Sequence, residues 1–508
     1  MALLKKPYNY IGSTFEKKGP STQDFRFRKT FECPCVKEDK VASICRRNNN
    51  MKKYDLIWIG TGQATGSTIP RLNSAGKSIA LIEGGRVGGS CVNYGCTPTK
   101  TLVASARAAH MARRGPDFGV ETGDFSINFD KIRERMNTIR NNGSSGLEGW
   151  LRGMENVDFY AEYASFINEH TVQVGDEVIY GETIVIHTGT RSRTFPFEGL
   201  DSVDWIDNQG LLDLEELPKK LLIIGGSYIG MEFGQAYRRF GSEVTIIEGG
   251  PQLMGREDAD IAQAAQTILE KDGIKIITGS FVKKLVQHAS ESIEVFYEQG
   301  GTMKSVQGSH LLIAVGRLPN SDKLNLEAAG VEANGQGYIT VNDTMQTNVP
   351  HIFAVGDING QGAFTHTSVN DGEIFYDFYT GSGDRKLSDR NLIYSMFIDP
   401  PLGRIGMNEK EARASDKNIL MATRKMSRIS RAREKDETDG LIKIFVDADT
   451  EEFLGVTILG IGGDEIINIF APFMMAKASY KLFRRTVLTH PTVAELLPWI
   501  LDDLKPLK

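Results

Sequence analysis

An internal repeat is the feature of this chain that most restricts its fold. A short apolar run at 54–59 leads into a glycine-rich turn at 60–62, and a second run at 221–224 leads into a similar turn at 225–227. At the same offset of 165 residues, each copy ends in another apolar run, a glutamate and a Gly-Gly pair. Each copy reads as strand, turn, helix, strand and acid, which predicts two βαβ units with buried parallel strands.

Each unit has the composition of a dinucleotide-binding turn. Glycines permit a tight turn and a close approach of a pyrophosphate to a helix N-terminus, and an acid about 20 residues onward accepts hydrogen bonds from ribose hydroxyls. Two copies with acids at equal spacing favour nucleotide binding over plain βαβ units. Both depart from the ideal motif, because Thr65 stands at the third glycine position of the first copy and Ser227 at the close-approach position of the second. The expected cofactor residues are Gly60, Gly62, Gly66 and Glu83 in the first unit and Gly225, Ser227, Gly230 and Glu248 in the second.

The five cysteines are unevenly distributed. Cys33, Cys35 and Cys45 lie in the first 50 residues, Cys91 and Cys96 lie close together, and no cysteine follows them. One close pair in an otherwise thiol-free body indicates redox or metal chemistry in a reducing compartment. Two nearby ligands, without a second CxxC or an HExxH motif, support a zinc site poorly, so redox chemistry is favoured and no resident metal is expected.

The close cysteine pair lies in a glycine-rich string at 88–100, and a helix is predicted at 97–114. In a regular helix, residues five apart differ by about 7.5 Å along the axis, beyond the ~6.8 Å upper end of disulfide Cα separations. An oxidised pair therefore needs a distorted first turn, which the glycines make feasible. Beside a helix N-terminus the dipole stabilises the thiolate of Cys96, so the string predicts a reducible, redox-active disulfide between Cys91 and Cys96.

Composition excludes several classes of protein. The chain has 59 Lys and Arg residues against 65 Asp and Glu, a net charge of −6, so no global basic field attracts nucleic acid or anionic lipid. No apolar run approaches the ~18 residues of a membrane span. A chain of 508 residues predicts about three to four domains. We expect a cytoplasmic enzyme with no nucleic-acid or membrane partner.

The motifs together resemble those of the pyridine nucleotide–disulfide oxidoreductases, the flavoenzymes that include dihydrolipoamide dehydrogenase, glutathione reductase and mercuric reductase. The resemblance rests on the string 88–100 and, in the family's order, on the strings 229–234, 314–317, 354–357 and 490–495. It implies an α/β fold with two Rossmann-like dinucleotide-binding domains plus a C-terminal α+β dimerisation domain. The implied boundaries are an FAD-binding domain at 51–200, an NAD-binding domain at 201–317, a central domain completing the FAD site at 318–388 and a dimerisation domain at 389–508.

The first 50 residues precede this resemblance. They are polar and mildly basic and show neither helical nor strand periodicity. They lack the apolar stretch of about 7–15 residues that a secretory signal carries. We expect a disordered extension, with a targeting segment or a metal-binding arm through Cys33 and Cys35 as the alternatives.

The resemblance also implies a path for electrons. The first repeat would bind FAD, and the second would bind NADH in preference to NADPH, because an acid at Glu248 accepts a ribose 2′-hydroxyl and repels a 2′-phosphate. Reduced FAD would reduce the disulfide, with Cys96 as the flavin-proximal, charge-transfer thiol and Cys91 as the interchange thiol. His490, oriented by Glu495, would serve as acid and base at the thiols of the other subunit, so a homodimer is expected.

Further positions are implied by the same resemblance. Lys100 would lie near the isoalloxazine and pair with Glu232, and Tyr228 would cover the nicotinamide pocket. Asp357 would contact the ribityl–phosphate region of FAD. The glycines Gly89 and Gly316 complete the expected cofactor-binding set.

The electron acceptor is the least determined property. Leu488 stands where dihydrolipoamide dehydrogenases usually carry an additional histidine, and the last residues contain no cysteine pair for a thiol relay. The string 96–104 resembles a mercuric-reductase-like branch, although typical mercuric reductases lack a base of the His490 type. We expect an NADH-dependent flavoprotein reductase acting on a small-molecule disulfide or a thiophilic metal ion. Dihydrolipoamide dehydrogenase, a flavin NADH oxidase or quinone reductase, and a scaffold with a degenerate site are the alternatives.

Overall fold

The structure is a computed structural model that describes residues 51–289 and 292–507. Contacts divide the chain into Met1–Met51 and Lys52–Lys508, and the description below concerns the second unit. The predicted disordered leader, with Cys33, Cys35 and Cys45, lies outside the described residues. Among the described residues, no helix combines the length and the apolar character that a membrane crossing needs.

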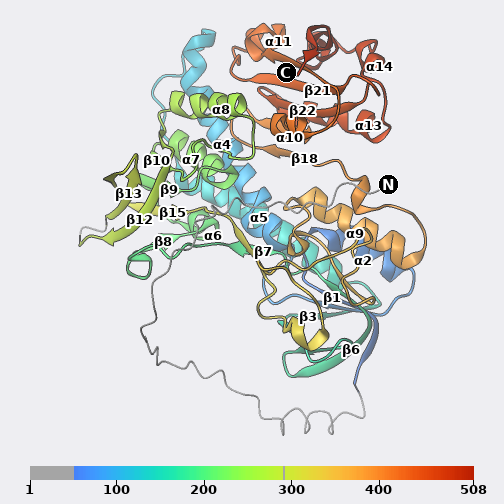
Figure 1. Cartoon of the computed structure of the whole chain (residues 1–508). Coiled ribbons are helices and arrows are strands. Elements are labelled where there is room, and N and C mark those ends of the chain that lie inside the picture. Colours follow the sequence, from blue (N-terminus) through green and yellow to red (C-terminus); the bar gives the residue numbers. More distant parts are fainter. Residues whose placement is uncertain (1–50, 290–291, 508) are drawn as a thin grey trace, which may run out of the picture. The chain divides into compact units, whose positions relative to one another are not determined.

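The first repeat lies at the centre of a seven-stranded sheet with the order β3-β2-β1-β6-β5-β4, in which β17 also pairs with β6 (Figure 1). Its parallel pairs place Leu56 opposite both Ile79 and Thr183. The two strands of the repeat are almost entirely buried, as their apolar runs predict. The strands are β1 (Lys53–Ile59), β2 (Ile79–Ile82), β3 (Val157–Tyr160), β4 (Ala164–Phe166), β5 (Thr171–Val174), β6 (Glu177–Ile186) and β17 (Ile352–Ala354).

Helices cover this sheet and carry the cysteine pair. A Cβ added at Gly372 of α9 would lie 2.6 Å from the hydroxyl oxygen of Thr68 in α2. The two helices therefore pack so closely that only glycine fits at this position. The predicted helix at 97–114 is α4, which follows a separate short helix, α3. The helices are α2 (Gln63–Ser74), α3 (Gly89–Tyr94), α4 (Cys96–Arg114), α5 (Phe129–Arg152) and α9 (Thr365–Thr380).

The second repeat forms a five-stranded parallel sheet with the order β11-β10-β9-β15-β8. An antiparallel three-stranded sheet, β12-β13-β14, and the pair β16-β7 accompany it. Its strands are β8 (Trp205–Ile206), β9 (Lys220–Ile224), β10 (Glu243–Ile247), β11 (Lys275–Ile277) and β15 (His310–Ile313). The other elements are β7 (Thr190–Ser192), α6 (Asn208–Asp213), α7 (Tyr228–Phe240), α8 (Ala259–Lys271), β12 (Ser280–Gln287), β13 (Ile293–Gln299), β14 (Thr302–Gly308) and β16 (Arg317–Pro319).

The C-terminal part is an antiparallel six-stranded sheet with short helices, in the order β18-β19-β22-β21-β20-β23. Together with the mixed seven-stranded sheet and the parallel five-stranded sheet, it confirms the predicted α/β class with a C-terminal α+β domain. Its strands are β18 (Ile393–Met396), β19 (Leu402–Gly406), β20 (Ile419–Lys425), β21 (Leu441–Asp447), β22 (Phe453–Leu459) and β23 (Lys505–Pro506). Its helices are α10 (Glu409–Ala414), α11 (Ser430–Glu434), α12 (Gly463–Ile466), α13 (Phe470–Met475), α14 (Tyr480–Arg484) and α15 (Leu497–Ile500).

One apolar core fixes α4, the helix that begins at Cys96, against α7. Leu102 and Ala106 of α4 share this core with Met231 and Phe233 of α7. Polar contacts at its edge add to it, since Arg107 of α4 and Arg239 of α7 both form ion pairs of 2.5 Å with the buried carboxylate of Asp399. The position of the cysteine pair is therefore set by both the second repeat and the segment that follows β18.

Candidate active site

Cys91 and Cys96 are held on two helices that meet at a break. Cys91 lies in α3 and Cys96 begins α4, and Gly95 between them has φ −130° and ψ −112°, which no regular helix contains. Both cysteines are free thiols. The break at Gly95 is the distorted turn that was expected between the two cysteines.

The two sulfurs of the pair differ in charge. The hydrogen bond from Cys91 and the ammonium of Lys100 lower the pKa of Cys96 to about 6, although burial of the sulfur acts in the opposite direction. The hydrogen bond to Cys96, together with burial, raises the pKa of Cys91 well above its ordinary value. Near neutral pH the pair is therefore a Cys96 thiolate beside a neutral Cys91 thiol.

Thr365 joins the pair from a distant part of the chain. Its hydroxyl oxygen lies 2.9 Å from the sulfur of Cys91 and 3.5 Å from the sulfur of Cys96. It is the first residue of α9, separated from Cys96 by 269 positions. Sequence reasoning missed this residue. The sequence does place Thr365 shortly after the 354–357 string. The strand of that string returns the chain to the first sheet, so residues just after it could have been considered as site residues.

Lys100 and Glu232 form the ion pair that the family resemblance implies. The lysine ammonium lies 2.7 Å from the carboxylate, and the glutamate side chain is only 6% exposed. The backbone N–H of Phe397 donates to the other carboxylate oxygen at 2.8 Å, and the ammonium lies 4.7 Å from the centre of the Phe397 ring. A buried carboxylate thus holds a positive charge on the helix turn next to Cys96.

The two glycine turns fit a dinucleotide. Gly60 and Gly225 have φ values of +107° and +114°, and an added Cβ at either would lie 2.3 Å from a carbonyl oxygen. At Gly230 an added Cβ would lie 2.1 Å from the carbonyl oxygen of Gly225, so the helix of the second unit starts against its own turn. At these three positions the neighbouring backbone leaves no room for a side chain. This is the close packing of helix, turn and strand that a pyrophosphate-binding unit requires.

In the first unit, Thr65 stands at the position equivalent to Gly230, and its hydroxyl forms hydrogen bonds to the surrounding residues. The Thr65 hydroxyl accepts from the indole N–H of Trp58 at 3.1 Å and donates to the carbonyl oxygen of Gly60 at 3.4 Å. Nothing lies within 4 Å of an added Cβ at the neighbouring Gly66. Thr65 rather than Gly66 is thus the residue that packs against the first turn.

His187 is a second residue that sequence reasoning missed. Its buried ring lies 2.5 Å from an added Cβ at Gly62, and its Nε2 accepts from the N–H of Ala64 at 3.3 Å. Its Nδ1 lies 2.8 Å from the carbonyl oxygen of Val355. Burial lowers the pKa of His187, so a neutral ring donates from Nδ1 and accepts at Nε2. The predicted Gly62 is required by this ring, and Gly89, with φ +62°, approaches Gly62 to a Cβ distance of 3.0 Å.

The acids of the two repeats occupy matching positions. Glu83 accepts from the N–H of Thr61 at 2.9 Å and from that of Gly85 at 2.8 Å. At the offset of the repeat, Glu248 accepts from the N–H of Gly226 at 2.6 Å and from that of Gly250 at 2.7 Å. Both carboxylates are therefore fixed at the glycine turn, where an acceptor for ribose hydroxyls is expected.

Asp357 lies beside the β7–β16 pair. Its carboxylate accepts from the Thr190 hydroxyl at 2.9 Å, and burial raises its pKa. Arg317, next to the predicted Gly316, donates to the backbone carbonyl of Thr190 at 2.6 Å and reaches the hydroxyl of Ser90 at 3.5 Å. This contact connects the 314–317 string to the residue that precedes Cys91.

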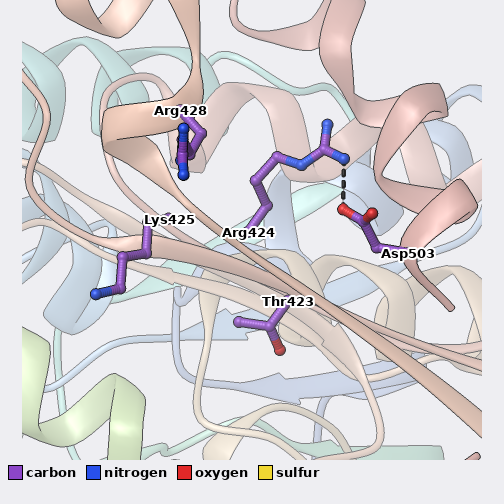
Figure 2. Close-up of a pocket in the computed structure, with 5 residues that line it drawn as sticks. All are labelled: Thr423, Arg424, Lys425, Arg428 and Asp503. Atoms are coloured by element: carbon purple, nitrogen blue, oxygen red, sulfur yellow. Dashed lines mark hydrogen bonds and ion pairs between the residues drawn. The ribbon is translucent and has the colours of Figure 1, made fainter. Parts of the chain in front are cut away.

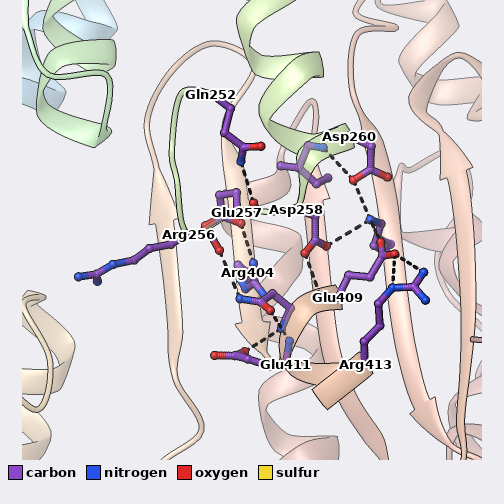
Figure 3. Close-up of polar contacts among 12 residues, drawn as sticks. Gln252, Arg256, Glu257, Asp258, Asp260, Arg404, Glu409, Glu411 and Arg413 are labelled. Atoms are coloured by element: carbon purple, nitrogen blue, oxygen red, sulfur yellow. Dashed lines mark hydrogen bonds and ion pairs between the residues drawn. The ribbon is translucent and has the colours of Figure 1, made fainter. Parts of the chain in front are cut away.

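Tyr228 lies among aromatic side chains above a buried acid. Its ring centre is 5.8 Å from that of Tyr394 and 6.4 Å from that of Phe364, and burial raises its pKa. Its hydroxyl lies 3.4 Å from the carboxylate of Glu257, which also accepts from Tyr394 at 2.5 Å. Figure 3 shows Glu257 with Arg404, which donates to it at 2.7 Å.

A neighbouring group of acids holds a lysine. Asp258, Asp260 and Glu409 offer carboxylate oxygens close enough to share a cation. The buried ammonium of Lys443 takes that place, at 3.2, 2.7 and 2.8 Å from them. Figure 3 shows the three acids side by side. The group is an ion cluster around a buried lysine, between α8, α10 and β21.

His490 and Glu495 are paired but lie away from the thiols of their own chain. The Nδ1 of His490 is 2.8 Å from a carboxylate oxygen of Glu495. The histidine side chain is 76% exposed, and no contact within the described ranges joins it to Cys91 or Cys96. The Nδ1 side of the ring is thus taken up by Glu495, and most of the side chain is exposed to solvent.

A cavity of about 460 Å³ lies on the same domain, at the end of β20. Thr423, Arg424, Lys425, Arg428 and Asp503 line it (Figure 2). Arg424 is held at 2.5 Å from the carboxylate of Asp503. None of the residues that line this cavity is among those predicted to carry redox chemistry.

Known proteins of one family resemble this chain in sequence and in structure. The sequence model of the pyridine nucleotide-disulphide oxidoreductases matches residues 54–372, and that of their dimerisation domain matches 393–501. The chain is 37% identical to the probable pyridine nucleotide-disulfide oxidoreductase RclA of Escherichia coli K12, over 88% of this chain and 98% of that protein. It is 29% identical to a mercuric reductase of Staphylococcus aureus (82% and 76%) and 31% identical to a dihydrolipoyl dehydrogenase of Bacillus subtilis (87% and 96%). The solved Cu(II) complex of the E. coli HOCl-induced flavoprotein disulfide reductase RclA matches with a TM-score of 0.80 and 35% identity, covering 88% of this chain and 99% of that one.

Proposed function

Because the chain belongs to the pyridine nucleotide-disulphide oxidoreductases, we propose that it is an NADH-dependent reductase of thiophilic metal ions, with Cu(II) as the first candidate acceptor. The observation that carries the proposal is the divided ionisation of the thiol pair, in which Cys96 is a thiolate beside Lys100 and Cys91 a neutral thiol. The printed names of two relatives, a mercuric reductase and a flavoprotein disulfide reductase in complex with Cu(II), support a metal acceptor.

The side chains around Cys91 and Cys96 stabilise the reduced, partly ionised form of the two cysteines. FAD, when bound at the first unit, supplies the two-electron carrier between NADH and the disulfide. Lys100, fixed by Glu232, stabilises the thiolate of Cys96 electrostatically, and the Thr365 hydroxyl can donate to either sulfur. Soft thiolate sulfur selects ions such as Cu(I) and Hg(II) over hard oxygen-preferring cations.

The reduced thiol pair would transfer two electrons to copper. One Cys91 thiol and one Cys96 thiolate give up two electrons, which reduce two Cu(II) ions to two Cu(I) ions. The S–S bond forms and one proton leaves Cys91. Because Cys91 starts neutral, a base has to take this proton, and His490 with Glu495 from a second copy of the chain fits that role. The dimerisation domain and the exposure of His490 support a homodimer.

NADH is the proposed electron donor. Glu248 is fixed at the glycine turn by the N–H groups of Gly226 and Gly250, which supports its proposed role as the acceptor for the adenosine ribose of the dinucleotide. A fixed carboxylate accepts from a 2′-hydroxyl and repels a 2′-phosphate. The ratio of kcat/KM for NADH to that for NADPH measures this preference directly.

An acceptor panel tests the proposal. The purified holoenzyme is supplied with NADH and with Cu(II), Hg(II), lipoamide, glutathione disulfide, a quinone or O₂, and Cu(I) formation is followed with a Cu(I)-specific chelating dye. We expect metal reduction in the wild type and only the enzyme-free rate in Cys91→Ser and Cys96→Ser.

Other outcomes identify the alternatives. Faster turnover with lipoamide than with any metal would establish a dihydrolipoamide dehydrogenase. NADH oxidation with O₂ or quinone that survives both serine variants would establish an oxidase or quinone reductase. A protein that carries no flavin and is not reduced by NADH would be a scaffold.

A further inference from the structure

The equivalence of the two dinucleotide units extends beyond the acid to the glycine that follows it. Gly84 and Gly249 come directly after Glu83 and Glu248, at the same offset of 165 residues. An added Cβ at Gly84 would lie 2.5 to 2.7 Å from three ring atoms of Tyr163, and one at Gly249 would lie 3.4 Å from two ring atoms of Phe281. In each unit an aromatic ring thus lies directly against the glycine next to the ribose-binding acid.

The two rings come from topologically equivalent places. Tyr163 lies between β3 and β4, three positions after β3 ends, and Phe281 lies in β12, four positions after β11 ends. Strand β3 pairs in parallel with β2, and β11 pairs in parallel with β10. Each ring therefore follows the third parallel strand of its own unit, although Tyr163 and Phe281 are not related by the sequence repeat.

Both rings are exposed to an extent that packing within the chain does not explain. The fractional exposure is 75% for Tyr163 and 61% for Phe281. Several other exposed rings have a cation over them, as Arg114 over Phe118 at 5.2 Å and Arg113 over Phe125 at 5.4 Å. Among the contacts of the described residues, neither Tyr163 nor Phe281 has an aromatic or cationic partner. Each offers a free π face beside a carboxylate that is fixed for ribose.

We propose that Tyr163 stacks on the adenine of FAD and Phe281 on the adenine of NADH. The inference rests on the proposed binding of these two dinucleotides by the two units. The ribose that each acid would hold carries the adenine base, so the base lies next to the glycine after the acid, where the free ring face is. Aromatic stacking on a base tolerates any purine and adds apolar burial without a hydrogen bond.

We call Phe281 the NADH platform and Tyr163 the FAD platform. A platform of this kind contributes a binding free energy that is the same before and during hydride transfer. The adenine lies at the opposite end of the dinucleotide from the reacting nicotinamide, and uniform binding changes KM and Kd but leaves kcat unchanged. The acid selects the ribose, and the ring adds affinity for the base.

The NADH platform is tested with Phe281→Ala and with ligands that contain or lack the adenosine half. We expect the Kd of ADP-ribose, measured by calorimetry on the holoenzyme, to rise about tenfold in Phe281→Ala and to stay near the wild-type value in Phe281→Tyr. Reduced nicotinamide mononucleotide, which has no adenine, should reduce the flavin at the same rate in all three proteins. Phe125→Ala, which removes an exposed ring far from both acids in sequence, serves as the matched control.

The outcomes separate the platform from the proposed function. An unchanged ADP-ribose Kd in a folded Phe281→Ala protein overturns the platform and leaves the reductase proposal standing. If the wild type binds ADP-ribose but reduces no metal, the acceptor proposal fails while the platform result stands. A wild type that binds no ADP-ribose overturns the NADH platform, and the acceptor panel then decides the reductase proposal by itself.

The FAD platform is tested by cofactor release. After dilution of the holoenzyme, flavin fluorescence reports the FAD that leaves the protein. We expect release about tenfold faster in Tyr163→Ala and close to wild type in Tyr163→Phe, because the phenylalanine keeps the ring and loses only the hydroxyl. Equal release rates in Tyr163→Ala and the wild type would overturn this half of the proposal.

Discussion

At the scale of single residues, the charge on Cys96 is the property on which the proposed chemistry depends. Its pKa of about 6 results from the hydrogen bond of Cys91 and from the Lys100 ammonium, both of which stabilise the thiolate. A group whose pKa is lowered in the folded protein keeps its charge above that value and loses it as the pH falls through it. The Cys96 thiolate should therefore be present at pH 7 and be lost progressively below about pH 6.

This ionisation can be followed in the two-electron-reduced holoenzyme through the long-wavelength absorbance of a thiolate against flavin. We expect the band to disappear on acidification with a midpoint near pH 6. In Lys100→Met the midpoint should move to higher pH, because the stabilising ammonium is gone. Lys410→Met, an exposed position on α10, should leave it unchanged. A midpoint that does not move in Lys100→Met would show that the lysine does not act on Cys96.

Thr365 gives a second prediction at this scale. Replacing it with valine keeps the shape of the side chain and removes the hydroxyl that lies 2.9 Å from Cys91 and 3.5 Å from Cys96. We expect the midpoint of the thiolate band to rise in Thr365→Val and to stay near the wild-type value in Thr365→Ser, which retains the hydroxyl. Equal midpoints in valine and serine variants would assign Thr365 a purely steric role.

At the scale of elements, the break between α3 and α4 gives the pair its geometry. The sequence predicts a helix from residue 97 and a distorted turn before it, and both are found, with Cys96 as the first helical residue. The separate helix α3 was not predicted, because its six residues are too few to show a hydrophobic period. The predicted domain boundaries near 200, 317 and 388 stay a prediction.

The buried pair of Glu257 and Arg404 connects the segment before α8 to β19. Their side chains are 0% and 3% exposed, so neither charge is stabilised by water. Glu257→Gln leaves the Arg404 guanidinium without its counter-charge, and we expect a loss of stability of about 3–5 kcal/mol, seen as a lower thermal midpoint.

Glu411→Gln on the neighbouring exposed surface is the matched control for this prediction and should change the midpoint by far less. Glu257 also lies 3.4 Å from the hydroxyl of Tyr228, so flavin reduction by NADH should be measured in both variants. A Glu257→Gln protein as stable as the wild type would show that the arginine finds other partners.

At the scale of the whole molecule, the exposed His490 predicts a site shared between two chains. Mixing His490→Ala with Cys91→Ser should restore activity after subunit exchange, because a mixed dimer combines intact thiols from one chain with an intact histidine from the other. Random exchange of equal amounts makes about half of the dimers mixed with one working site in each, so about a quarter of wild-type activity is expected. No recovery despite demonstrated exchange would place thiols and base in one chain.

The sequence by itself determined the two βαβ units and the close cysteine pair. Their glycines, acids and cysteines interact with neighbours that lie within one βαβ unit or one helix start, so the local order of residues contains the information. Glu83 and Glu248 contact their own turns as the equal spacing predicts. The pairing of Lys100 with Glu232 was available only through the family resemblance, because the two positions lie in different units.

Only the tertiary structure decided which distant side chains complete these sites. Thr365 reaches the thiols because β17 joins the first sheet and its chain then turns into α9, and no periodicity encodes that approach. Tyr163 and Phe281 meet equivalent glycines although no sequence repeat relates them, because the third parallel strand of each unit ends at the same edge of its sheet. Contacts of this kind depend on where whole elements pack, which is fixed by the burial of apolar faces shared among several segments.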